Sequence, residues 1–160
     1  MLEVTVKRSE WLRGRMSIER DEHGLTSGGS FLYREEDGTK CCLGFACLAA
    51  GLSIAQIKGV CMPAGLVNNT WRDKTPRVPV AKFPESLAKL LMPERNNEGG
   101  VRREDSYASS KLAGVNDQVY EYSGPIRDHS KEVRDYTDAE REERIIELGV
   151  DVGIKFTFVD

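Results

Sequence analysis

The feature that most constrains this chain is the apolar segment CCLGFACLAAG at residues 41–51, which holds three of the four cysteines. Leu43 and Cys47 recur at helical spacing, and Gly51 can adopt the left-handed conformation that closes a helix. The segment therefore predicts a buried helix over residues 42–50. A cysteine in such a helix can be a core residue, a metal ligand or a nucleophile, so its role decides how the function is interpreted.

Both ends of the chain carry the period-two pattern of a strand with one apolar face. The apolar positions are Leu2, Val4 and Val6 near the start and Val150, Val152, Ile154, Phe156 and Phe158 near the end. We expect strands at residues 2–7 and 150–159 to share one sheet. The unbroken apolar face of the last strand requires a cover, and the cysteine helix is the most apolar candidate.

The chain between these strands predicts several helices. Thr137 and Glu140 form the pattern of a capping box, which begins a helix that Gly149 ends. Shorter helices are expected at residues 54–58, 84–92 and 105–112, with Gly114 to Asp117 ending the last of them, and a hairpin with an Asp-Gly tip is expected at residues 31–41. The prediction is a single α+β domain over residues 1–160, with a small sheet that includes both terminal strands, packed by the cysteine helix and several short helices.

Composition excludes several classes of function. The 160 residues are 39% hydrophobic and 31% charged, which is typical of one ordinary globular domain. The formal net charge is −3, so no global positive field draws the chain to DNA or to anionic lipid, and we expect neither nucleic acid nor a membrane as partner. No apolar run reaches the roughly 18 residues of a membrane span. We expect a cytoplasmic protein with reduced thiols.

The spacing of the cysteines does not match a metal site. Structural zinc sites use Cys-x-x-Cys pairs or comparable knuckles, whereas Cys41 and Cys42 are adjacent and Cys47 and Cys61 follow at other intervals. No dinucleotide or phosphate-loop fingerprint occurs either. We therefore predict neither a metal nor a cofactor.

One catalytic alternative remains, a cysteine-dependent hydrolase or transferase built on Cys42 and His129. A cysteine at a helix N-terminus has its thiolate stabilised by the helix dipole, and a histidine further along the chain can serve as its base. The apolar neighbours of these cysteines favour buried core thiols instead. We expect Cys42 and Cys47 to be reduced, buried and without metal.

A candidate site for an anionic ligand lies after a glycine pair, at Arg102 and Arg103. Two forked guanidinium groups suit bidentate recognition of phosphate, and the glycines allow a loop to close over it. Trp11 or Tyr107 can stack on a base. These four residues are predicted to bind a small anionic nucleotide. The alternative is that the arginines are solvated and that a protein partner binds elsewhere, for example at residues 17–30.

Several short motifs follow one another along the chain. The most specific is Cys-Cys-Leu-Gly-Phe at residues 41–45, and the others are Trp11-Leu12-Arg13-Gly14, Gly51, Pro63, Val115-Asn116-Asp117 and Val150-x-Val152 before a Phe-rich strand. Over nearly the whole chain this order resembles a family of small bacteriophage proteins of uncharacterised function. The resemblance carries no activity to transfer. It implies a non-enzymatic accessory protein that binds and neutralises a host factor, either by sequestering a nucleotide signal or by inhibiting a defence protein, in the cytoplasm of the infected cell.

Overall fold

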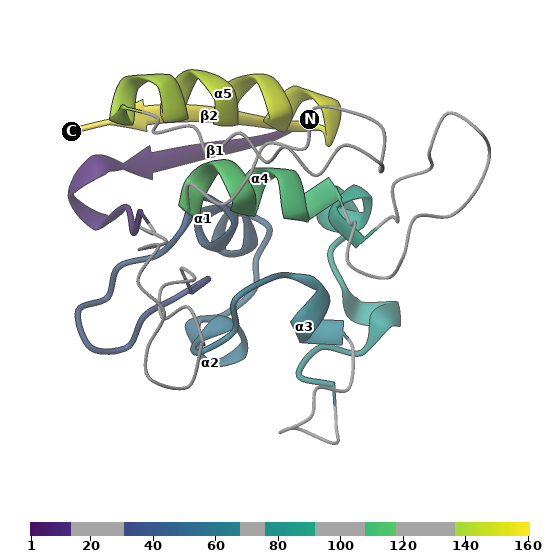
Figure 1. The fold of residues 1–160 in the computed structure, drawn as a ribbon. Helices are drawn as coiled ribbons and strands as arrows, with labels where there is room; N and C mark the ends of the chain where they lie inside the picture. The colour runs from purple at the N-terminus through teal and green to yellow at the C-terminus, as the bar shows by residue number, and fades with distance from the viewer. Residues whose placement is uncertain (14–30, 68–75, 92–107, 118–136) are drawn as a thin grey trace, which may run out of the picture.

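The first and last strands of the chain lie side by side. β1 (Leu2–Lys7) and β2 (Ile154–Val159) form a two-stranded parallel sheet in which Val4 lies opposite Phe156 and Val6 opposite Phe158. Figure 1 shows the purple and yellow arrows of these strands next to each other. The predicted sheet between the two terminal strands is confirmed.

The computed structural model describes residues 1–13, 31–67, 76–91, 108–117 and 137–160. Between the strands it contains the helices α1 (Cys42–Ala49), α2 (Ile54–Ile57), α3 (Ala64–Val67), α4 (Ala108–Asp117) and α5 (Asp138–Asp151), and the 3-10 helices η1 (Arg8–Glu10), η2 (Val80–Lys82) and η3 (Glu85–Leu91). The α+β class is thereby confirmed.

Three helices build the core around the sheet. α1 contacts β1 and α5 contacts β2, while α4 contacts both α1 and α5. One face of the sheet is closed, because Val4, Val6, Ile154 and Phe156 are at most 3% exposed, whereas the alternate residues of both strands face solvent. The alternation in the sequence therefore predicts the two faces correctly.

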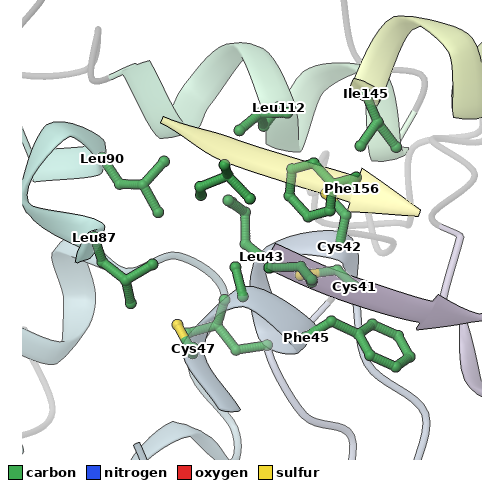
Figure 2. Close-up of a cluster of buried hydrophobic side chains, with 14 of the residues drawn as sticks. Cys41, Cys42, Leu43, Phe45, Cys47, Leu87, Leu90, Leu112, Ile145 and Phe156 are labelled. Carbon is green, nitrogen blue, oxygen red and sulfur yellow. The ribbon is translucent and has the colours of Figure 1, made fainter. Parts of the chain in front are cut away.

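The cysteine helix lies at the centre of this core. The six residues Cys42–Cys47 of α1 are all buried. Figure 2 shows Cys42 and Leu43 in one cluster of buried side chains with Phe156 of β2 and Leu112 of α4. A helix that is apolar on every side must be enclosed on every side, which explains why α1 has helices and strands around it. The prediction of a buried helix that covers the sheet is confirmed.

The junction between α5 and β2 differs from the prediction. The expected strand begins at residue 150, but α5 continues to Asp151 and β2 begins at Ile154. Gly153, with φ of +80°, makes the turn. Gly149 has a different role: a β-carbon there would lie 2.6 Å from the Phe156 ring and 2.7 Å from the Ile154 carbonyl oxygen, so its absence lets α5 approach β2 closely.

The predicted hairpin at residues 31–41 is present only as a turn. The main-chain N–H of Arg34 donates to the Thr39 carbonyl oxygen at 2.8 Å, and that of Cys41 donates to the Phe31 carbonyl oxygen at 3.0 Å, but the two arms form no regular strands. Each arm instead forms an isolated bridge to a distant segment, Tyr33 with Lys58 and Lys40 with Trp11. The tertiary contacts of these arms replace the local ladder that the sequence suggests.

The short helices follow their predicted positions with shifted ends. α2 has a capping box of Ser53 and Gln56, and α5 has the predicted one of Thr137 and Glu140. The expected helix at residues 84–92 is the 3-10 helix η3. The prediction that Gly114 to Asp117 end the preceding helix is wrong, because α4 includes them and its end is buried.

Candidate functional site

The thiols of the cysteine segment are shielded from solvent. Cys41, Cys42 and Cys47 are at most 2% exposed, whereas Cys61 is exposed, and all four are free thiols. Burial in the apolar core raises the pKa of Cys42 well above the 9.0 of an ordinary thiol, and it raises the pKa of Cys47 in the same direction. The prediction that Cys42 and Cys47 are buried is confirmed.

The N-terminus of α1 does not offer Cys42 an activating environment. The main-chain N–H of Cys42 donates to Oδ1 of Asn116 at 3.1 Å, so the helix N-terminus is partnered by a neutral amide. The side chain of Cys42 is fully buried, and burial raises its pKa by more than the main-chain N–H groups of Leu43 and Cys42 lower it. His129, the proposed base, lies outside the described residues.

Asn116 is the hub of a buried polar cluster. Its Oδ1 also accepts a hydrogen bond from the indole Nε1 of Trp11 at 2.8 Å, and its Nδ2 donates to the carbonyl oxygen of Leu12 at 3.0 Å. Asn116 is itself fully buried at the end of α4. One side chain thus joins α4 to the N-terminal segment and, through Cys42, to α1.

Two charged residues complete this cluster. The Asn116 Nδ2 donates to Oδ1 of Asp117 at 2.8 Å, and Arg141 of α5 donates through Nη1 to the main-chain oxygen of Asn116 at 3.0 Å. Asp117 is 7% exposed and Arg141 is 3% exposed. Trp11, Asn116, Asp117 and Arg141 are called the Asn116 cluster below.

The start of α5 also contacts the N-terminal segment near the cluster. The Arg13 guanidinium forms an ion pair with Asp138 at the start of α5 and lies 5.5 Å from the centroid of the Trp11 ring. Asp117 ends α4 in the same neighbourhood. The N-terminal segment, the end of α4 and the start of α5 are therefore held together by one set of contacts.

The predicted ligand-binding residues are not brought together in the described part of the chain. Arg102, Arg103 and Tyr107 lie outside it. Trp11 is described, and it is a core residue: it is 4% exposed, its N–H is bound by Asn116, and its ring centroid lies 4.8 Å from that of Phe158. In this conformation the indole has no free face for a base, and nucleotide binding by these four residues stays a prediction.

The sequence did not reveal the buried polar side chains, Asn116 and Lys40 among them. Asn116 was interpreted as part of a turn, although the apolar Val115 beside it hinted at burial. Lys40 is 6% exposed, pairs with Glu10, and places its Nζ 4.7 Å from the Phe45 ring centroid and 5.9 Å from that of Tyr33. The ammonium group of Lys40 lowers the pKa of Glu10. A lysine directly before the cysteine segment was the only signal for this arrangement.

Other classes of site were sought in the part of the chain that the structure describes. No group of three or more His, Cys, Asp or Glu residues lies close enough there to hold a metal ion. Within those same residues, no helix has the length and apolar character needed to cross a membrane. Comparison of the chain with family models, with curated proteins and with solved structures finds no match.

Proposed function

We propose that this protein acts by binding rather than by catalysis, as a phage accessory protein that binds and neutralises a host factor in the cytoplasm of the infected cell. The burial of Cys42 supports this proposal most directly. A nucleophile must reach its substrate as a thiolate, whereas this thiol is fully buried and its pKa is raised. In this proposal the cysteine segment forms part of the core, and residues at the surface bind the host factor.

The Asn116 cluster supports a binding role in a second way. Binding surfaces are commonly carried on connecting segments that a rigid scaffold positions. Here a buried, hydrogen-bonded network and the Arg13–Asp138 ion pair fix the N-terminal segment, the end of α4 and α5 relative to one another. The exposed Arg13 and Asp138, whose side chains are 41% and 57% exposed, place charge at the rim of this scaffold.

The target that we propose to test first is a nucleotide signal, because Arg102 and Arg103 suit bidentate phosphate recognition. The purified protein is heated with a panel of cyclic and linear nucleotides. We expect one of them to raise the melting temperature, since ligand at about 100 times its Kd stabilises the folded state by about 2.7 kcal/mol. The shift should be lost in an Arg102→Ala, Arg103→Ala double variant.

The control is Arg144→Ala, which removes an arginine that pairs with Glu147 on α5. It should keep the shift. If no nucleotide shifts the melting temperature, the nucleotide branch is wrong and the host factor is a protein, to be identified by pull-down from infected lysate. Turnover of any substrate that is lost in a folded Cys42→Ser variant would contradict the binding proposal itself.

A further inference from the structure

The two outer edges of the sheet are not equivalent. α5 lies directly against β2, since a β-carbon at Gly149 would come within 2.7 Å of the Ile154 carbonyl oxygen. Figure 1 shows α5 on the β2 side of the sheet and β1 on the side away from α5. β1 therefore carries the edge that α5 leaves open.

Alternate residues of β1 direct their main-chain groups toward this open edge. The N–H of Leu2 donates to the Gly153 carbonyl oxygen at 2.9 Å, and the parallel register continues from there to the end of both strands. In a parallel ladder, residues bonded to the neighbouring strand alternate with residues whose N–H and C=O point the other way. Glu3, Thr5 and Lys7 thus face the outer edge, where no other main-chain group of the described residues binds them.

The strand that carries this edge is held in place, and the side chains on its solvent face are exposed. The side chains of Glu3 and Lys7 are 79% and 59% exposed, and Thr5 between them is exposed as well. The intervening Val4 and Val6 are fixed in the core at 2% and 0% exposure. An ordered edge strand whose outward main-chain groups have no partner among the described residues is a template for a further strand.

We propose that this edge binds a second copy of the same chain, with the two β1 strands antiparallel about a two-fold axis at Thr5. This register sets Glu3 of each copy opposite Lys7 of the other, and Thr5 opposite Thr5. Opposite charges in directly facing positions stabilise an antiparallel pair. In each of these pairs the two residues direct their main-chain N–H and C=O groups at each other, so the pair forms two N–H···O hydrogen bonds.

The sequence of β1 selects this register over its neighbours. Moving one strand by two residues sets Glu3 opposite Thr5 or opposite Ser9 and removes the opposed charges. In the proposed register Glu3 lies between Lys155 of its own chain, 3.2 Å away, and Lys7 of the second copy. The result is a four-stranded sheet with alternating charges, and a sheet of that size is more stable than a two-stranded one.

Sedimentation velocity of the full chain over a range of micromolar concentrations tests this proposal. We expect a species of twice 17.9 kDa that dissociates on dilution. Thr5→Pro removes the outward N–H at the axis, which an edge strand tolerates without loss of the β1–β2 ladder. This variant should be monomeric with an unchanged circular dichroism spectrum. A wild-type chain that is monomeric at every concentration would overturn the proposal, as would a dimeric Thr5→Pro variant.

Charge reversal keeps the test decisive if Thr5→Pro fails to fold. Glu3→Lys sets lysine opposite lysine at both symmetric positions and should weaken the dimer roughly tenfold. Adding Lys7→Glu should restore the dimer, because opposite charges again face each other. Within each chain of this double variant, residue 3 still lies beside the like charge of Lys155 and residue 7 beside that of Glu10. The control Lys155→Gln, which removes only the intrachain partner of Glu3, should leave the dimer affinity unchanged. Failure of the double reversal to restore the dimer would refute the register.

Discussion

Replacing Gly44 with alanine is expected to destabilise the protein by about 3 kcal/mol or more, or to prevent folding. A β-carbon at Gly44 would overlap the carbonyl oxygen of Leu32 and lie 2.7 Å from its carbonyl carbon. Leu32 cannot withdraw easily, because it is fully buried and its own N–H donates to the Val60 carbonyl oxygen at 2.7 Å. The free energy of unfolding in urea measures the effect.

Gly65→Ala is the matched control, since Gly65 also lies in a short helix of the described chain. Its β-carbon would meet only Cγ1 of Val60, at 3.1 Å, and that side chain can adjust. The better helix propensity of alanine offsets part of any cost, so we expect a change within about 1 kcal/mol. Equal effects of the two substitutions would contradict the close approach of α1 to the main chain at Leu32.

Asn116→Ala is expected to have a comparably large effect, on the order of 3 to 5 kcal/mol. The substitution leaves the Trp11 indole N–H, the Cys42 main-chain N–H and the Leu12 carbonyl oxygen without the partner they have in the structure. Each group is costly to leave unsatisfied in the core, at about 1 to 3 kcal/mol. Urea unfolding again measures the loss.

A double-mutant cycle separates the hydrogen bond from the packing of Trp11. Trp11→Phe removes the indole N–H and keeps an aromatic ring against Phe158. Because the two side chains share one bond, the double variant should be less destabilised than the sum of the single variants, by about 1 kcal/mol or more. Additive effects, or a loss below about 1 kcal/mol for Asn116→Ala, would show that the cluster is not the hub described above.

The elements predicted correctly are those whose sequence pattern matches their final environment. The alternation at both termini matches a sheet with one buried face, and the capping box at Thr137 begins α5 where expected. Cys41 to Cys47 are apolar on every side of a helix, so burial follows from composition alone. In these segments the local preference and the tertiary contacts agree.

The elements predicted incorrectly are those in which a tertiary contact overrides the local preference. Asn116 and Asp117 are typical turn residues, yet the amide of Asn116 binds three groups in two other segments, and α4 stays helical through both residues. Gly149 suggests the end of a helix, yet it lies within α5 because β2 passes close to it. A single sequence shows neither contact. Asn116 binds residues far from it in the chain, and the contact of Gly149 with β2 depends on the turn that joins α5 to β2.

The candidate site was harder to predict than the fold. Of the predicted ligand-binding residues, Trp11 alone falls in the described chain, and its indole N–H serves the Asn116 cluster. An exposed aromatic residue and a buried one with a polar partner look the same in a sequence. The cysteine segment was the opposite case, because its apolar neighbours already favoured a core role over a nucleophile.

We expect that the cysteine segment builds the core and that none of its thiols reacts from the folded state. Labelling of the native protein with a thiol reagent, with the modified residues located by mass spectrometry, tests it directly. We expect Cys61 to react in the native state, more slowly than a free thiol because partial burial raises its pKa. Cys41, Cys42 and Cys47 should react only after unfolding. Rapid labelling of Cys42 in the folded protein would contradict the account and favour the cysteine-dependent enzyme.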